Sequence, residues 1–195
     1  MKKNKITKTE KTICVFCGSR PGKNPGFVTI AEEIGTTFAS EGWTLLYGAG
    51  SSGLMGTSAQ AAIDAGGKVI GVIPSRFPEE VLPNLYYTIK TTTIQERKSV
   101  MFNCSDVIVV LPGGIGTLEE FFEVLTWKQL GWHDKPVILF NFEGYWDNIS
   151  NLVGNIVDNE FADADSQKLY SVERTLPDLI SRLRESLSSR SCSNE

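Results

Sequence analysis

Short apolar runs rich in β-branched residues alternate along this chain with segments of helical pattern. The runs are typical of strands, and the longer segments between them are typical of helices that bury one face. The apolar runs predict strands at Thr12–Phe16, Thr44–Tyr47, Val69–Ile73, Tyr87–Thr91, Val107–Leu111 and Val137–Phe140. The intervening segments predict helices at Phe27–Ser40, Leu54–Ala65, Ile94–Cys104, Leu118–Leu130 and Tyr145–Asn159.

The order of these elements predicts an α/β fold. Strands that alternate with helices along a chain form mainly parallel sheets. The runs Val69–Ile73 and Val107–Leu111 are apolar without an alternation of period two. Because such strands are buried on both sides, we expect a doubly wound sheet with helices on both faces.

The remainder of the chain extends this pattern without adding a second domain. Leu169–Val172 is a candidate last strand, and a helix is predicted from Pro177 to about Leu187. The two ends, residues 1–11 and 188–195, are polar and are expected to be flexible. We therefore expect one domain over residues 12–187.

Charge and composition limit the kinds of partner. A formal net charge of −4 argues against a protein that relies on a broad positive field to bind nucleic acid or an anionic membrane. The basic N-terminus is not followed by the apolar segment of a secretion signal, and no run is long enough to cross a bilayer. We expect a cytoplasmic protein that holds any phosphate by local contacts.

The sulfur and imidazole ligands are too few and too scattered for a metal centre. Cys14 and Cys17 form a C-x-x-C pattern, but both fall inside an apolar run that predicts a buried strand. Neither Cys104 nor Cys192 supplies a second pair, and His133 is the single histidine. No metal site is therefore expected, and reduced structural thiols are favoured over a redox pair.

Three glycine-rich turns follow predicted strands, at Gly18–Gly22, Gly48–Gly53 and Pro112–Thr117. Ligands of parallel α/β sheets bind at the carboxyl ends of the strands, where glycine lets the backbone approach an anion at the start of a helix. Gly48–Gly53 also fits G-x-G-x-x-G, although it follows the second strand and lacks the acidic residue expected of a dinucleotide site. The need for a tight turn would explain the glycines of any one loop. Three such loops at one edge of the sheet favour a nucleotide or sugar-phosphate site.

Two helix segments carry candidate chemistry. Thr117 to Glu120 fits a capping box, in which threonine caps the helix and glutamate reaches back to it. Glu120 points away from the apolar face formed by Leu118, Phe121, Phe122 and Leu125, and is equally consistent with a cleft or with solvent.

Arg97 interrupts the apolar stripe of Ile94, Met101 and Cys104. A buried guanidinium needs an acidic partner or an anionic ligand. Local pairing with Glu96, or exposure at the end of the helix, is an open alternative. Lys98 can reach solvent or the same anion.

Taken together, these motifs resemble the Lonely Guy (LOG) family of cytokinin riboside 5′-monophosphate phosphoribohydrolases, often labelled lysine decarboxylase-like. The resemblance covers nearly the whole chain and is most specific in the P-G-G-x-G-T-x-x-E signature at Pro112–Glu120, paired with Glu96-Arg97-Lys98. It implies a Rossmann-like fold and a homodimer that releases base and ribose 5-phosphate from a nucleoside 5′-monophosphate. It implies no metal or organic cofactor.

The resemblance assigns the catalytic pair to Arg97 and Glu120. Because cleavage of the ribosyl C–N bond develops positive charge on the ribose, we expect Glu120 to stabilise that charge and orient water. We expect the 5′-phosphate to bind the N–H groups of Gly114–Thr117 and the Thr117 hydroxyl, with Arg97 holding Glu120 and the ribose in place. Glu120 cannot serve that role and close the capping box at once. The implied substrate contacts are Gly18, Ser19, Gly48, Gly50, Met55, Glu79 or Glu80, Arg97, Lys98, Gly113, Gly114, Ile115, Gly116, Thr117, Leu118, Glu119, Glu120 and Thr126.

Three positions depart from the family pattern. Gln95 stands where the family often has histidine, Arg20 where it often has a second serine, and Ala49 where it has glycine. Gln95 leaves the Arg97 and Glu120 pair intact, whereas Arg20 is placed to change how phosphate or base is held. The substrate is left open between a cytokinin nucleotide and AMP.

Other functions compete with hydrolysis. A nucleotide sensor that binds without cleaving is the main alternative, because this kind of fold can keep a pocket and lose its chemistry. An NADP-dependent reductase rests only on Gly48–Gly53 and Arg76. Lysine decarboxylation would need a pyridoxal phosphate lysine with a partner for the pyridinium nitrogen, and no segment suggests one.

Overall fold

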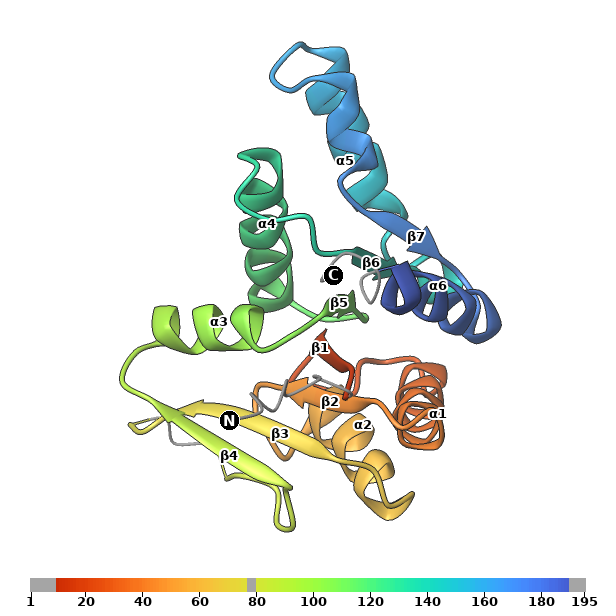
Figure 1. The fold of residues 1–195 in the computed structure, drawn as a ribbon. Helices are drawn as coiled ribbons and strands as arrows, with labels where there is room; N and C mark the ends of the chain where they lie inside the picture. The colour runs from red at the N-terminus through yellow and green to blue at the C-terminus, as the bar shows by residue number, and fades with distance from the viewer. Residues whose placement is uncertain (1–9, 77–79, 190–195) are drawn as a thin grey trace, which may run out of the picture.

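The computed structural model describes residues 10–76 and 80–189 and contains one parallel sheet with helices on both faces (Figure 1). The strands are β1 (Thr12–Phe16), β2 (Thr44–Tyr47), β3 (Val69–Pro74), β4 (Tyr87–Thr91), β5 (Val107–Val110), β6 (Val137–Phe140) and β7 (Ser171–Glu173). The helices are α1 (Gly26–Ser40), α2 (Gly53–Asp64), α3 (Ile94–Asn103), α4 (Ile115–Gln129), α5 (Asp147–Asp158) and α6 (Leu176–Ser189). Short 3-10 turns lie at Phe142–Gly144 and Ala164–Lys168.

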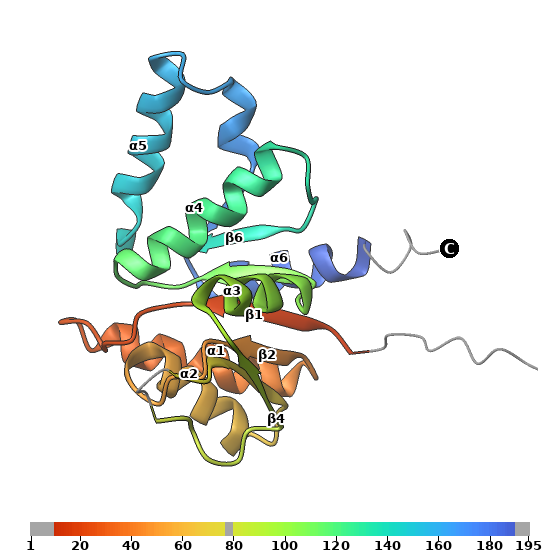
Figure 2. The ribbon, with the colours of Figure 1, turned by 90° about the vertical axis from the view of Figure 1, so that its left-hand side faces the viewer.

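The strand order is β4-β3-β2-β1-β5-β6-β7, and every neighbouring pair is parallel. This confirms the expected α/β class and the mainly parallel sheet. Successive side chains of β1 point to opposite faces, so Ile13 and Val15 pack with α1, α2 and α6, while Cys14 and Phe16 pack with α3, α4 and α5. Figure 2 shows α4 and α5 on one side of the sheet and α1 and α2 on the other.

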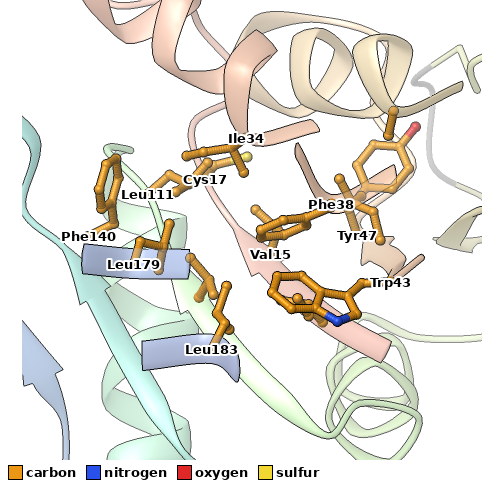
Figure 3. Close-up of a cluster of buried hydrophobic side chains, with 14 of the residues drawn as sticks. Val15, Cys17, Ile34, Phe38, Trp43, Tyr47, Leu111, Phe140, Leu179 and Leu183 are labelled. Atoms are coloured by element: carbon orange, nitrogen blue, oxygen red, sulfur yellow. The ribbon is translucent and has the colours of Figure 1, made fainter. Parts of the chain in front are cut away.

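The larger core cluster lies between the sheet and the layer of α1, α2 and α6. Phe38 of α1, Tyr47 of β2 and Leu183 of α6 are completely buried in it (Figure 3). Burying one such side chain contributes about 1.5–3 kcal/mol of transfer free energy. The continuous apolar character of the strands is therefore explained by cores on both faces, which hold the strand ends in fixed positions.

Strand β1 lies between β2 and β5, where the direction of winding changes. The chain leaves β1 toward α1 on one face and leaves β5 toward α4 on the other face. The two loops therefore diverge at the carboxyl ends of β1 and β5. Such a divergence opens a crevice in which ligands of doubly wound proteins bind.

Helices α4 and α5 and strand β7 begin two or three residues away from their predicted starts. Helix α4 begins at Ile115 rather than Leu118, and α5 begins at Asp147 rather than Tyr145. The residues before α5 form a separate turn in which Glu143 has φ 52°, which stops the helix from extending backward. Strand β7 covers Ser171–Glu173 because it pairs in register with Ile138 to Phe140 of β6.

Helices α1 and α2 approach so closely that Gly35 leaves no space for a side chain. A Cβ atom on Gly35 would lie 2.1 Å from the carbonyl oxygen of Ser58. We expect Gly35→Ala to lower the free energy of unfolding in urea by about 1–3 kcal/mol, because the backbone of α2 must move away from the added methyl group. Thr36→Ala, at the exposed next position, should change the unfolding free energy by less than about 0.5 kcal/mol. A Gly35→Ala protein as stable as wild type would contradict this close packing.

Candidate active site

A cavity of about 700 Å³ opens at the carboxyl ends of β1 and β5. The loops after these two strands supply most of its wall, which places it at the crevice expected from the topology. Its lining residues are Cys17, Gly18, Ser19, Arg20, Pro21, Gly22, Phe27, Leu54, Met55, Arg97, Pro112, Gly113, Gly114, Ile115, Gly116, Thr117, Glu120 and Tyr145.

Two of the three glycine-rich turns lead into helices whose first N–H groups already have protein acceptors. At α2, the carbonyl oxygen of Gly18 accepts from the N–H groups of Leu54 at 3.0 Å and Met55 at 3.3 Å. At α1, the side-chain oxygen of Asn24 accepts from the N–H of Gly26 at 2.9 Å. These contacts stabilise the loops against each other, and they occupy N–H groups that would otherwise bind an anion.

The start of α4 is different. Gly114 precedes the helix in an extended conformation and accepts from the N–H of Leu118 at 3.1 Å. Within residues 10–76 and 80–189, the N–H groups of Ile115, Gly116 and Thr117 have no acceptor. Free N–H groups and the helix dipole attract an anion, and all three residues line the cavity.

The predicted capping box is therefore wrong. Thr117 is the third residue of α4 rather than its cap, and its side chain is buried beside the cavity. A Cβ atom on Gly113 would lie 2.1 Å from the Thr117 hydroxyl oxygen, so Gly113 makes room for this hydroxyl. Because the helix begins at Ile115, Glu120 lies in its second turn and faces the cavity instead of the helix end.

Arg97 and Glu120 meet in the wall of this cavity. The Arg97 Nη1 and a Glu120 carboxylate oxygen are 3.4 Å apart, and the two side chains are only 14% and 13% exposed. Arg97 Nε donates to the carbonyl of Val72 at 3.0 Å, and its Nη2 donates to that of Gly48 at 3.2 Å. The partner that Arg97 requires is therefore Glu120 rather than Glu96, whose carboxylate instead accepts from the N–H of Thr92.

Burial controls the protonation of Glu120. It raises the pKa of this carboxyl to about 7. The positive charge of Arg97 lowers this pKa, the negative charge of Glu119 raises it, and the positive charge of Lys98 lowers it. Near neutral pH the carboxyl can therefore exist in either form. A carboxyl poised in this way is suited to accept or donate a proton during catalysis.

Two thiols of the first strand and its loop are influenced by the charge of this carboxylate. Burial, with the charge of Glu120 as a further cause, raises the pKa of both Cys14 and Cys17 well above the ordinary value. Both thiols are neutral and buried, which fits the prediction of structural cysteines.

Several predicted contact residues lie away from the cavity wall. Lys98 is buried between α3 and α4, where it pairs with Glu119 and, at 2.9 Å, with Glu123. Thr126 is exposed and donates to the carbonyl of Phe122. The other predicted residues that do not line the cavity are Gly48, Gly50, Leu118, Glu119 and Glu80, while Glu79 lies outside the described residues.

The sequence patterns missed the apolar part of the wall. Phe27 and Leu54 open α1 and α2, and the Phe27 and Tyr145 rings meet edge to face with centroids 5.3 Å apart. Tyr145 also donates from its hydroxyl to the carbonyl of Gly113 at 2.6 Å. A large apolar residue directly after a glycine-rich turn was the available signal, but helix packing explains such a residue equally well.

No group of three or more histidine, cysteine, aspartate or glutamate side chains is placed to hold a metal ion in the described ranges 10–76 and 80–189. Both ring nitrogens of His133 are engaged by the backbone, one with the carbonyl of Val124 and one with the N–H of Lys135. The same ranges contain no helix long and apolar enough to cross a membrane.

Comparisons with known proteins identify the family of this chain. A family model described as "Possible lysine decarboxylase" matches residues 55–183. A probable cytokinin riboside 5′-monophosphate phosphoribohydrolase of Oryza sativa subsp. japonica is 41% identical over 177 residues, which cover 90% of this chain and 77% of the relative. A cytokinin riboside 5′-monophosphate phosphoribohydrolase of Arabidopsis thaliana is 40% identical over 177 residues, covering 90% and 83%.

Solved structures of two other kinds share the fold. The molybdenum cofactor carrier protein of Chlamydomonas reinhardtii is 26% identical with a TM-score of 0.69, covering 92% of this chain and 99% of that one. DNA processing protein A of Helicobacter pylori is 10% identical with a TM-score of 0.57, covering 90% and 81%, and shares the fold alone. The family model and the sequence relatives together show that this chain belongs to the LOG family.

Proposed function

We propose that the protein hydrolyses the N-glycosidic bond of a purine nucleoside 5′-monophosphate, releasing the free base and ribose 5-phosphate. The observation that carries this proposal is the buried Arg97 and Glu120 pair, placed in the same cavity as the free N-terminus of α4. The names of the relatives support the reaction class. The substrate is a cytokinin nucleotide or AMP.

The 5′-phosphate binds at the start of α4. The N–H groups of Ile115, Gly116 and Thr117, together with the Thr117 hydroxyl, offer donors to its oxygens. Arg20 lines the same cavity and has no partner in the described part of the chain. Its charge adds to the helix dipole, so the phosphate is held locally in a protein of net charge −4.

Cleavage separates the base from C1′ of the ribose. As the bond to the purine nitrogen breaks, positive charge develops on the ribose, and the Glu120 carboxylate stabilises it. Glu120 also orients a water molecule and takes its proton as the oxygen bonds to C1′. The purine leaves with the bonding electrons and receives a proton, so that one water is consumed overall. Arg97 keeps Glu120 in place and compensates its charge.

The apolar part of the wall suits a planar base. Phe27, Leu54, Met55 and Tyr145 line one cavity with the catalytic pair, and Ile115, which is 87% exposed, lies at its edge. Such surfaces bind aromatic rings while a few polar groups set their orientation. The cavity therefore combines a phosphate site, a carboxylate and an apolar wall, which are the three parts of a nucleotide substrate site.

We also propose that the protein is cytoplasmic and acts as a homodimer, without nucleic acid or membrane partners. The family resemblance supports the dimer, and the net charge of −4 disfavours polyanionic partners.

A non-hydrolytic carrier or sensor is the second candidate function. The similarity to the carrier protein of Chlamydomonas reinhardtii, at 26% identity over nearly the whole chain, favours it. Incubation with AMP and with N6-isopentenyl-AMP, followed by chromatography, separates the two candidates. Release of free base supports hydrolysis, whereas retention of intact nucleotide supports the carrier.

Glu120→Gln removes the carboxylate charge and keeps the side-chain shape. We expect kcat for base release to fall by at least roughly 100-fold, because the developing ribose charge and the attacking water lose their stabilising group. Folding should be preserved in thermal unfolding. Glu33→Gln, an exposed glutamate on α1, is the matched control and should keep wild-type kcat. Wild-type turnover by Glu120→Gln would refute the assignment.

The ionised form of Glu120 is the active one in this mechanism. Because burial raises the pKa of Glu120 to about 7, kcat/KM should rise with pH through this region and level off above it. The phosphate of AMP titrates near pH 6, so its own titration must be measured and subtracted. A profile that falls as pH rises through 7 would mean that the protonated carboxyl is the active form.

Arg20→Ser removes the positive side chain of the β1–α1 loop that lines the cavity. We expect the KM for AMP to rise roughly 10-fold with kcat nearly unchanged, since a charge-assisted contact to phosphate is lost. Activity on adenosine, which has no phosphate, should not change. Lys23→Ser is the control, because Lys23 is exposed in the same loop but does not line the cavity. Equal effects of both variants would indicate only long-range attraction.

A further inference from the structure

Gly48 follows β2 directly and is buried, yet it does not line the cavity. It also lacks the positive φ that would make glycine necessary for the backbone; the neighbouring residue with φ 65° is Ala49. Neither close approach to a ligand nor backbone conformation therefore explains a glycine at this position.

The Arg97 side chain explains it. A Cβ atom on Gly48 would lie 1.7 Å from Arg97 Nη2 and 2.9 Å from Cζ, well inside contact distance. The carbonyl oxygen of the same residue accepts from Nη2 at 3.2 Å. The guanidinium thus lies against the bare Cα of Gly48 and is anchored to its carbonyl.

This contact determines which nitrogen of Arg97 reaches the carboxylate. Arg97 donates from Nε to the carbonyl of Val72 at 3.0 Å and from Nη2 to the carbonyl of Gly48. Nη1 is therefore the nitrogen directed at Glu120, at 3.4 Å. Because the guanidinium is planar and rigid, displacing Nη2 turns the whole group. A methyl group at position 48 would therefore move Nη1 relative to Glu120.

We propose that Gly48 is a positioning residue of the active site, whose missing side chain forms the slot that holds the Arg97 guanidinium against Glu120. The catalytic meaning of this slot rests on the proposed hydrolase function, but the slot itself does not. Gly48 acts through Arg97 and touches neither the cavity nor, in this proposal, the substrate.

The variant Gly48→Ala tests the proposal. Its backbone is compatible with alanine, and the atoms that must yield are the end of a flexible side chain, so the fold should persist in circular dichroism. We expect kcat to fall roughly 10- to 100-fold with a smaller change in KM, because the catalytic pair is misaligned. Gly154→Ala, whose added Cβ would lie no closer than 3.8 Å to Gln167, is the control and should retain wild-type kcat.

A titration of Glu120 by carboxyl-carbon NMR gives a readout that requires no turnover. Arg97 lowers the pKa of Glu120, so its displacement in Gly48→Ala should raise that pKa and move the acidic limb of the pH profile upward. Within residues 10–76 and 80–189, the other titratable groups that interact electrostatically with Glu120 are Lys98, Glu119 and the thiols of Cys14 and Cys17. The variant changes none of these side chains.

A double-mutant cycle isolates the contact. In the Arg97→Ala background no guanidinium remains to be displaced, so adding Gly48→Ala should leave the Glu120 titration unchanged. An unchanged titration in the single variant, or an equal shift in both backgrounds, would overturn the proposal. If wild-type protein binds AMP without releasing base but the titrations behave as expected, the slot stands and the proposed hydrolysis fails.

Discussion

The buried guanidinium of Arg97 is the constraint around which this end of the sheet is arranged. Removing such a charge from water costs several kcal/mol unless it is compensated by hydrogen bonds and an opposite charge. Here two backbone carbonyls, from Val72 and Gly48, and the Glu120 carboxylate provide the compensation. Strand β3, the residue after β2 and the two helices α3 and α4 must therefore meet at one point, and the doubly wound topology brings them together there.

The same burial gives the site its chemical character. Glu120 is removed from water along with Arg97, and the opposing effects of burial and of the guanidinium leave its pKa about 7. An exposed glutamate would be fully ionised at neutral pH and held less rigidly. Meanwhile the free N–H groups at the start of α4 supply positive potential a short distance away, so one cavity offers both a carboxylate and an anion site.

Sequence patterns predicted the fold well because the dominant signal was local. The interior strands are apolar on both faces because each lies between two helical layers, so their type and order follow from the pattern of apolar residues along the chain. Boundaries depended on less local effects. Helix α4 starts at Ile115 because Gly114 precedes it in an extended conformation, and the apparent cap at Thr117 is one turn too late. The pattern of a capping box was present without its geometry.

In the candidate site, too, some features follow from the sequence and others only from the fold. The sequence by itself determined that Arg97 needs a partner, because burying an unpaired charge is costly wherever the charge lies. It also determined that Pro112 to Glu120 forms a glycine-rich start of a helix, because this follows from residue spacing along the chain. The tertiary structure decided which glycine-rich turns leave N–H groups free for a ligand and which glycines instead satisfy contacts within the protein. Gly18 satisfies the start of α2 and Gly48 accommodates Arg97, whereas the N–H groups after Gly114 remain free. The physical reason is that an N–H group or a bare Cα acquires its role from the atoms that pack against it, and residues distant in sequence supply those atoms.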